Sequence, residues 1–178
     1  MAPQREILGT GKYLELVREG TWEFAVRNKG SGVACIIPVT DDNALVLVEQ
    51  WRAALNAPCI ELPAGLVGDE DDAEEDMLTA AKRELEEETG FRAQEWTRVW
   101  EGASSPGLTP ETVNMYLATR LTRVGNGGGT GHEDITVHVV PLDTIEGWLA
   151  KQRQRGAAID IKVFSALGLA RGAVDPLP

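Results

Sequence analysis

The chain has few cysteines, no long apolar run and no excess of basic residues. Its two cysteines, Cys35 and Cys59, lie in apolar, strand-like runs and lack Cys-x-x-Cys spacing, which argues against a disulfide or a metal site. We interpret them as reduced core residues of a cytoplasmic protein. No apolar run reaches the roughly 18 residues of a membrane-spanning helix, and the N-terminal MAPQREILGTGKY lacks the apolar core of a signal peptide. We therefore expect no membrane partner.

The acidic charge of the chain is confined to one segment. The formal net charge is −11, and residues 69–88 contain eleven acids and two bases, a net charge of −9. The rest of the chain therefore carries only −2. Because general nucleic-acid binding needs a basic surface, the sequence predicts no nucleic-acid partner.

The pattern of apolar and turn residues predicts an α/β fold. A length of 178 residues suits a single domain, for which about 150 residues is the usual size. Apolar alternation and buried-type runs predict strands, and 3.6-residue periodicity predicts helices. The strands are expected at 12–27 (a pair around a Glu-Gly turn), 33–39, 44–51, 59–65, 96–100, 113–118 and 135–140, and the helices at 74–89, 144–154 and 160–170.

The stretch AAKRELEEETGF places several carboxylates on one helix face. Glu84 and Glu88 stand one turn apart with Glu87 beside them, and each such like-charged pair costs roughly 0.2–0.5 kcal/mol. A solvated surface is the ordinary explanation of a Glu-rich face. Leu85, however, anchors the opposite side in a core, and the preceding turn ELPAGLVG can bring backbone carbonyls close. Such an oxygen set suits Mg²⁺ or Mn²⁺ better than zinc, and a cation would offset the repulsion.

These residues resemble the Nudix hydrolase family. RELEEETGF, which begins at Arg83, matches the end of the Nudix box, R-E-U-x-E-E-x-G-U with U apolar. Glu75 is separated from Arg83 by seven residues, as the box requires. The leading glycine departs from the pattern, because nine residues separate Gly65 from Glu75 where the box has five. We interpret the difference as a four-residue insertion, since Gly68, although nearer, is also misplaced.

Other segments are similar to the ADP-ribose pyrophosphatase branch of that family. They are SSPGLT, with Pro106 fifteen residues beyond the box, EQWRAALNAPCIELPAGL, EDITVHVVPLD, GKYLEL and TWEFAVR. The resemblance implies a Nudix-like α/β/α sandwich on a mixed β-sheet, with a small N-terminal β-sheet region at 1–30 and a catalytic domain at 31–178. It also implies a homodimer that exchanges the N-terminal strands and hydrolyses ADP-ribose to AMP and ribose 5-phosphate.

The resemblance assigns the chemistry to the acidic helix. Two or three Mg²⁺ or Mn²⁺ ions would cancel the charge of a diphosphate and acidify a bound water. Glu84, Glu87 and Glu88 are the expected ligands, with Glu88 also essential for catalysis, and the backbone carbonyl of Ala64 is implied by the resemblance. Arg83 is expected to orient these carboxylates, and a surface ion pair is the alternative.

Substrate contacts are expected at six residues that come from three regions of the chain. Arg52 has the fork geometry to bind a phosphate or the terminal ribose, although an exposed arginine at a strand end is an equal interpretation. Tyr13 and Trp22 match aromatics that sandwich adenine between two subunits in the branch, although either can be a core residue. The full set is Tyr13, Trp22, Arg27, Arg52, Pro106 and Gly107.

The group that activates water is expected on the glycine-rich loop GNGGGTG. In the branch, acids precede the EDI strand start, but here Gly131 and His132 occupy those positions. Glu133 is therefore the expected general base or closing metal ligand, and Asp134 reads as a strand-end residue. His132 is a rival because imidazole titrates near neutral pH. The glycines would let the loop close over substrate.

Three other functions stay open. A non-catalytic Nudix module that binds ADP-ribose is one, although a sensor does not need a multi-metal carboxylate face. Hydrolysis of another nucleoside diphosphate sugar, such as GDP-mannose, is the second. The third is an acidic protein that binds Ca²⁺ through 69–76, a run that lacks the alternating ligands and the glycine of an EF-hand loop.

Overall fold

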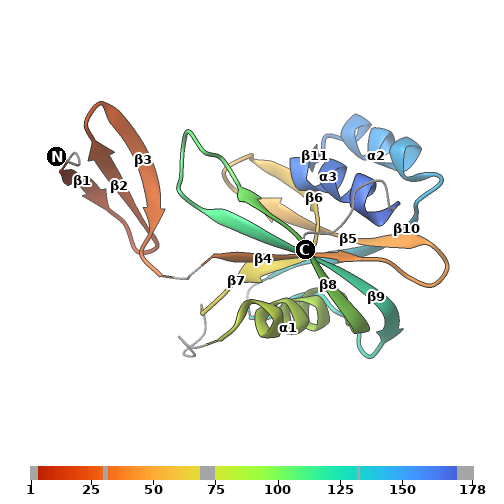
Figure 1. The fold of residues 1–178 in the computed structure, drawn as a ribbon. Helices are drawn as coiled ribbons and strands as arrows, with labels where there is room; N and C mark the ends of the chain where they lie inside the picture. The colour runs from red at the N-terminus through yellow and green to blue at the C-terminus, as the bar shows by residue number, and fades with distance from the viewer. Residues whose placement is uncertain (1–3, 30–31, 69–74, 132, 172–178) are drawn as a thin grey trace.

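The computed structural model describes residues 4–29, 32–68, 75–131 and 133–171. These residues form a three-stranded N-terminal sheet and two four-stranded sheets, with helices on both outer faces of the sheet pair (Figure 1). The N-terminal sheet stands to one side of the rest of the molecule.

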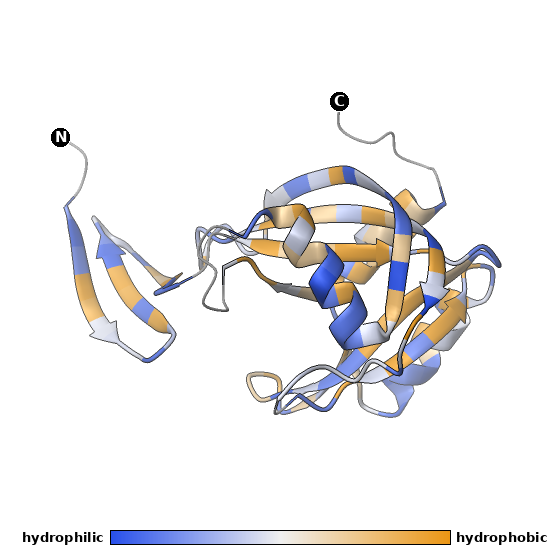
Figure 2. Ribbon diagram, turned by 90° about the horizontal axis from the view of Figure 1, so that it is seen from below, coloured by the Kyte–Doolittle hydropathy of each residue, from blue (hydrophilic) through white to orange (hydrophobic). Residues whose placement is uncertain are grey.

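The N-terminal sheet contains little buried apolar surface. Its strands are β1 (Arg5–Thr10), β2 (Leu14–Glu19) and β3 (Trp22–Arg27), antiparallel and in the order β1-β2-β3. Apolar and polar residues alternate along them (Figure 2). Val17 is fully buried, but Ile7, Leu16 and Trp22 are exposed. An isolated small sheet needs a covered apolar face for stability. Within one chain, most of the apolar side chains of this sheet have no such cover.

Each of the other two sheets mixes parallel and antiparallel pairs. The first has the order β7-β4-β9-β8, with β4 and β9 parallel, and the second has the order β10-β5-β6-β11, with β6 and β11 parallel. Their bounds are β4 (Val33–Pro38), β5 (Ala44–Arg52), β6 (Ala57–Glu61), β7 (Ala64–Leu66), β8 (Phe91–Ala103), β9 (Thr112–Arg123), β10 (Thr136–Pro141) and β11 (Ala158–Ile159). The predicted strands fall at these positions, but β8 and β9 are much longer than the predicted 96–100 and 113–118, and the predicted strand 59–65 is divided into β6 and β7. The sequence pattern predicted no strand at β1 or β11.

Helices cover both faces. The helix α1 (Met77–Thr89) packs on one face through Ala81 and Leu85, and α2 (Ile145–Gln154) and α3 (Ile161–Ala170) contribute to the core on the other. The predicted α/β class and the α/β/α arrangement are confirmed. The predicted single mixed sheet is instead a pair of mixed sheets.

The first helix begins later than predicted. It starts at Met77 and not at residue 74, because Asp76 caps it by accepting hydrogen bonds from the backbone N–H groups of Leu78 at 2.9 Å and Thr79 at 3.1 Å. Glu75 therefore lies outside the helix and can turn back along it. The helix ends as predicted at Gly90, whose φ of 72° is left-handed.

The two cysteines are buried and free, in agreement with their predicted core positions. Burial raises the pKa of Cys35 and that of Cys59 to about 12, so neither thiol ionises at neutral pH. None of the helices among the described residues combines the length and the apolar composition that crossing a membrane requires.

Candidate active site

Arg83 is the hub of the acidic cluster on α1. Its Nε and Nη2 atoms donate to the two carboxylate oxygens of Glu75, at 3.0 and 3.2 Å. Its Nη1 donates to Glu84 at 2.8 Å and to Glu87 at 3.2 Å. The hydrogen bonds with Glu75 are the main reason that the pKa of Arg83 is raised. An arginine that holds three acids at once matches the predicted orienting role better than a surface ion pair.

Glu84 lies against the backbone of Gly65. A Cβ atom at Gly65 would stand 1.7 Å from Oε1 and 2.0 Å from Cδ of Glu84, so only glycine leaves room for this carboxylate. Gly65 itself is fixed by pairing with Ala34 of β4. The steric requirement identifies Gly65, and not Gly68, as the leading glycine of the box. The insertion therefore lies between β7 and α1, largely in residues 69–74, which are outside the described part of the chain.

We expect Gly65→Ala to fold but to lose roughly 10²-fold in turnover, because displacing a reacting group by about 1 Å can cost that much. The added methyl group would displace the Glu84 carboxylate, which is the flexible end of its side chain, and leave the backbone in place. Steady-state kinetics and thermal unfolding measure the two effects. Gly147→Ala on α2 is the control, since a Cβ there meets nothing within 4 Å. An active Gly65→Ala variant would contradict this assignment of the glycine.

Glu88 is buried more deeply than any other acid in the described part of the chain. Only 3% of it is exposed, and its Oε2 accepts a hydrogen bond from the backbone N–H of Ala64 at 3.1 Å. Burial raises its pKa to about 8, and the charge of Glu84 adds to the shift. Burial also raises the pKa of Glu84, despite the ion pair with Arg83. A buried carboxylate, Glu88, and a partly buried one, Glu84, thus lie near each other without enough positive charge to favour their ionised forms.

This donor set fits a hard divalent cation. Carboxylates and a backbone turn at Ala64 meet at one place, and a cation would stabilise the ionised forms that burial disfavours. Within the described ranges, no three Asp, Glu, His or Cys side chains converge closely enough to hold a metal ion by themselves. Backbone or water oxygens would therefore have to complete the coordination, as is usual for Mg²⁺.

Glu86 belongs to a separate ion pair. Arg92 of β8 forks onto its carboxylate through Nε at 2.6 Å and Nη2 at 2.8 Å. These hydrogen bonds lower the pKa of Glu86. Arg83 thus holds Glu84 and Glu87, and Arg92 holds Glu86, whereas Glu88 contacts neither arginine and accepts from the Ala64 N–H. The two arginines therefore offset part of the repulsion between the carboxylates of α1, which the sequence analysis expected a cation to offset.

The glycine-rich loop after β9 is held against the end of α1. The backbone N–H groups of Gly128 and Gly129 donate to the carbonyl oxygens of Glu88 at 2.9 Å and Glu87 at 3.0 Å. A Cβ atom at Gly127 would stand 2.4 Å from a backbone carbon of α1, so glycine permits this close approach. The glycines thus let the loop pack against the end of α1, in addition to giving its backbone conformational freedom.

The loop brings Glu133 near the acid cluster. Its Oε2 accepts a hydrogen bond from the backbone N–H of Thr130 at 2.8 Å, and its charge contributes to the raised pKa values of Glu84 and Glu88. The side chain remains exposed and can move. This placement is compatible with the predicted general base. The rival His132 lies outside the described residues.

Arg52 forms an ion pair with a buried acid, a contact that the sequence did not reveal. Its Nε and Nη2 donate to the two oxygens of Glu61 at 2.6 and 2.5 Å. Glu61 is only 7% exposed, and its charge contributes to the raised pKa of Glu88. The guanidinium is therefore directed toward the acid cluster. Sequence reasoning did not single out Glu61, although one acid at the end of an apolar strand was an available signal.

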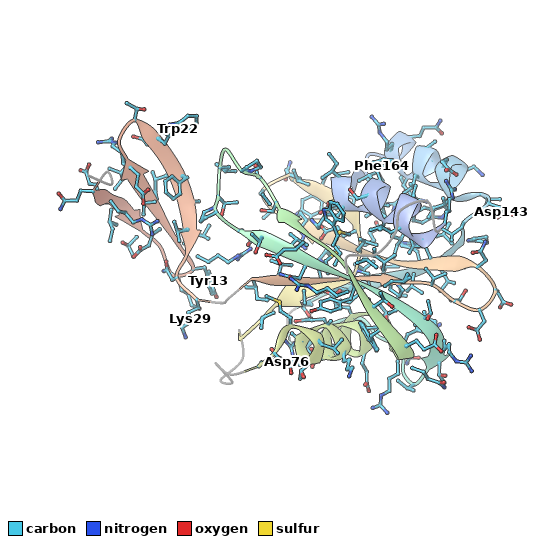
Figure 3. All side chains as sticks on the ribbon, viewed as in Figure 1. Tyr13, Trp22, Lys29, Asp76, Asp143 and Phe164 are labelled. Atoms are coloured by element: carbon cyan, nitrogen blue, oxygen red, sulfur yellow. The ribbon has the colours of Figure 1, made fainter. Side chains whose placement is uncertain are left out.

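Tyr13 and Trp22 lie at opposite ends of the N-terminal sheet. They are 68% and 69% exposed, and neither is a core residue (Figure 3). Leu14, next to Tyr13, pairs with Arg27, whereas Trp22 pairs with Glu19. The two aromatics are therefore separated by about five residues of strand, or roughly 17 Å. One chain does not bring both side chains to a single adenine.

Trp22 shares a cavity with two other predicted substrate residues. Pro106 and Gly107, in the turn between β8 and β9, line the same cavity of about 340 Å³. The turn is attached to the N-terminal sheet by a hydrogen bond from the Ala25 N–H to the Leu108 carbonyl oxygen, at 2.8 Å. The structure thus brings together residues that are more than eighty positions apart.

Tyr13 and Arg27 line a second cavity, of about 410 Å³, together with Leu66 of β7. The Nε of Arg27 donates to Glu111 at 2.5 Å. This cavity begins next to Gly65, and it therefore adjoins the turn that holds Glu84. Of the predicted site residues, those of α1, β7 and the loop form one cluster, and those of the N-terminal sheet lie to one side of it (Figure 3).

A sheet sandwich with a glycine turn packed on a helical carboxylate face defines a Nudix-type hydrolase fold. The chain belongs to the Nudix family, since the NUDIX domain model matches residues 29–165. The family prediction is confirmed.

The chain is also similar to several characterised proteins. It is 35% identical over 111 residues to the methanol dehydrogenase activator of Bacillus methanolicus, matching 62% of this chain and 57% of that protein. It is 37% identical over 94 residues to the ADP-ribose pyrophosphatase of Bacillus subtilis, matching 53% of this chain and 49% of that protein. A GDP-mannose pyrophosphatase of Cronobacter sakazakii is 31% identical over 150 residues, matching 80% of this chain and 74% of that protein.

A solved structure shows the same fold along nearly the whole chain. It is an ADP compounds hydrolase with a TM-score of 0.74 and 20% identity, and the likeness covers 97% of this chain and 94% of that one. At this identity the likeness concerns the fold alone. The chain spans about half the length of the first curated relatives that it matches.

Proposed function

We propose that the protein hydrolyses the diphosphate bond of ADP-ribose to AMP and ribose 5-phosphate in a Mg²⁺-dependent reaction. The observation that carries the proposal is a pair of carboxylates packed against the Ala64–Gly65 turn: the buried Glu88, which accepts from the Ala64 N–H, and the partly buried Glu84, which Arg83 orients. A binding module would gain nothing from burying two acids at a raised pKa. Similarity to ADP-ribose pyrophosphatases supports the choice of substrate.

The residues of the site have distinct tasks in this proposal. Two or three Mg²⁺ or Mn²⁺ ions would be held by Glu84, Glu87, Glu88 and the Ala64 carbonyl. Arg83 orients the carboxylates of Glu84 and Glu87 through its hydrogen bonds. Bound Mg²⁺ supplies charge neutralisation of the diphosphate and a more acidic water. Glu133 accepts the proton of the attacking water. One water is added across the P–O–P bridge, and each product leaves as a monophosphate.

Binding of the two halves of the substrate is assigned to the surrounding residues. Arg52, held toward the site by Glu61, has its Nη1 available for a phosphate oxygen or the ribose, because Nε and Nη2 are used by Glu61. Aromatic faces suit adenine. The adenine contacts are assigned to Tyr13 and Trp22 from different subunits, with Arg27, Pro106 and Gly107 nearby.

The exposed N-terminal sheet supports the proposal of a homodimer. Within the described residues 4–29, the strands expose apolar side chains and place Tyr13 and Trp22 far apart, whereas the described residues from 32 onward contain both core clusters. Exchange of the N-terminal strands between two chains would cover that surface and bring aromatics from both to one site. The cytoplasmic location stays a prediction from the sequence.

GDP-mannose is the second candidate substrate. Its support is a GDP-mannose pyrophosphatase of which the chain matches 74%. The acid cluster acts on the diphosphate, which both substrates share, and therefore does not distinguish them.

The proposal is tested by product analysis with ADP-ribose and GDP-mannose, each with Mg²⁺, with Mn²⁺ and with excess chelator. We expect AMP and ribose 5-phosphate from ADP-ribose, no turnover in chelator, and slower cleavage of GDP-mannose. Preference for GDP-mannose would favour the second candidate substrate. Binding of ADP-ribose without turnover in either metal would refute the proposal that the protein is an enzyme.

Deletion of residues 1–28 should weaken both dimerisation and affinity for ADP-ribose. Light scattering of the intact protein should give the mass of two chains, and the deletion should give a monomer or a weak dimer with a raised KM. Tyr13→Ala and Trp22→Ala should each raise KM without unfolding the protein, because both side chains are exposed. Phe164→Ala, an exposed aromatic on α3, is the control. A single-chain mass for the intact protein would contradict the dimer.

A further inference from the structure

Among the residues that the structure describes, the cavity beside Tyr13 is lined by three bases and by no acid. Its volume is about 410 Å³, within the roughly 300–1,000 Å³ that is typical of small-molecule sites. The residues that line it are Lys12, Tyr13, Arg27, Asn28, Lys29 and Leu66. The chain as a whole carries a formal net charge of −11, so this lining is a local exception. It favours a ligand that carries negative charge.

The two lysines of this cavity keep their charge for a ligand. Within the described part of the chain, neither Lys12 nor Lys29 forms a salt bridge, whereas Arg27 is paired with Glu111, which lines a different cavity. The Nζ atom of Lys12 instead lies 4.8 Å from the centroid of the Tyr13 ring. Its interaction with the Tyr13 side chain raises the pKa of Lys12, so the ammonium group is charged at neutral pH.

Backbone contacts hold the two lysines at the same end of the N-terminal sheet. The backbone N–H of Asn28 donates to the Tyr13 carbonyl oxygen at 3.0 Å, and the Asn28 side chain donates to the Gly11 carbonyl oxygen at 3.0 Å. Lys12 and Lys29 are the chain neighbours of these residues, and Figure 3 shows Tyr13 and Lys29 at this one end of the sheet. The turn before β2 and the segment after β3 therefore bring both lysines to one cavity.

Leu66 connects this cavity with the acid cluster. It lines the cavity, and its carbonyl oxygen accepts a hydrogen bond from Nη2 of Arg83 at 3.5 Å. Leu66 also directly follows Gly65, against which the Glu84 carboxylate packs. One residue of strand, roughly 3.3 Å, thus separates the cavity wall from that glycine. A nucleotide with its diphosphate at Glu84 can therefore extend past Leu66 into the cavity.

The charge of the lining indicates which chemical group of the nucleotide lies there. The Tyr13 ring suits adenine, as the proposed function assigns. The hydroxyls of an unmodified ribose are neutral and would leave two ammonium groups without a counter-charge. A phosphate monoester on that ribose carries about 1.5 to 2 negative charges at neutral pH and three acceptor oxygens. Lysine binds such a group as a point charge with three donors.

We propose that Lys12 and Lys29 bind a phosphate monoester on the adenosine ribose, so that the preferred substrate is ADP-ribose phosphorylated at its adenosine 2′ or 3′ hydroxyl. The assignment rests on the proposed function, which places the adenosine at Tyr13 and the diphosphate at the acid cluster. Hydrolysis adds one water across the P–O–P bridge and yields an adenosine bisphosphate and ribose 5-phosphate. The extra phosphate takes no part in the reaction and changes only the affinity.

The first test is binding, measured by titration calorimetry with adenosine 2′,5′-bisphosphate, adenosine 3′,5′-bisphosphate and AMP. At least one bisphosphate should bind the wild type roughly tenfold more tightly than AMP, because each lysine adds a charge-assisted hydrogen bond. The preference should shrink as salt is added. Lys12→Gln/Lys29→Gln should reduce it to about twofold or less, and the fold should survive because both side chains are exposed.

Lys151→Gln is the matched control, because Lys151 is an exposed lysine of α2 that does not line the cavity. It should keep the wild-type preference for the bisphosphate. The kinetic counterpart is the ratio of kcat/KM for the phosphorylated ADP-ribose to that for ADP-ribose, in Mg²⁺. The double variant should lower this ratio by roughly tenfold, through KM and not through kcat.

The outcomes separate this assignment from the proposed function. The bisphosphate that binds more tightly identifies the hydroxyl that carries the phosphate. Equal binding of AMP and both bisphosphates by the wild type overturns the phosphate assignment alone. A double variant that keeps the preference, or a Lys151→Gln variant that loses it, also overturns it. Tight, lysine-dependent binding of a bisphosphate by a protein that does not cleave ADP-ribose refutes the proposed function and supports the anion site.

Discussion

Glu88→Gln should lower turnover by about 10³-fold or more while the protein stays folded. The substitution keeps the shape of the side chain and its contact with Ala64 but removes a ligand charge from the most buried acid of the cluster. Charge stabilisation by a bound metal contributes several kcal/mol to catalysis, and each 1.36 kcal/mol corresponds to a factor of ten. The measurement is kcat at saturating Mg²⁺ and ADP-ribose.

The same variant makes a prediction about stability and pH. Because the pKa of Glu88 is raised from 4.5 to about 8 in the folded protein, the folded state holds its proton more tightly than the unfolded state. In the metal-free protein, the contribution of Glu88 to the free energy of unfolding should therefore be fully present below about pH 4.5 and be lost as the pH rises to 8. The loss is on the order of 1.4 kcal/mol per unit of pKa shift. Glu88→Gln should remove this dependence, and Mg²⁺ should raise the Tm of the wild type at pH 8 but much less that of the variant.

Glu86→Gln is the matched control, because Glu86 lies on the same helix but faces Arg92. It should retain turnover and the Mg²⁺ effect on Tm. Full activity of Glu88→Gln, or equal losses in the two variants, would contradict the metal site.

Glu133→Gln is expected to have the second large effect, a loss of roughly 10²–10⁴-fold in kcat, the usual contribution of one general base. KM should change little, because the exposed side chain is assigned to proton transfer and not to substrate binding. Water near a divalent cation needs only a weak base, so a carboxylate of ordinary basicity suffices.

Two other variants test this assignment. Asp134→Asn, at the neighbouring exposed acid, should keep turnover. His132→Ala should also keep it, and a large loss there without one in Glu133→Gln would transfer the role to the histidine. If none of the three matters, water must be activated at α1 without the loop.

The elements of the fold followed from local sequence patterns. Alternation in the strands, the helix-ending Gly90 and the periodicity around Leu85 each depend on neighbours in the chain, so they predicted the positions of β2 to β6, α1, α2 and α3. The apolar periodicity does not mark the start of α1, which is set by the Asp76 side chain as it caps the backbone N–H groups of Leu78 and Thr79. The full length of β8 was missed because its exposed residues lack a strong apolar alternation.

The sequence by itself was enough to predict the Nudix family and the acidic helix face with Arg83. The reason is that one short motif contains the helix residues, the expected metal ligands and the helix-ending Gly90. Only the tertiary structure decided which glycine serves the box, since it shows that a Cβ atom at Gly65 of β7 would stand 1.7 Å from Oε1 of Glu84 on α1. It also decided that Glu61 holds Arg52, that the glycine loop docks on α1, and that Tyr13 and Trp22 lie apart. Each of these features depends on packing, burial or strand register, which the local sequence pattern does not predict.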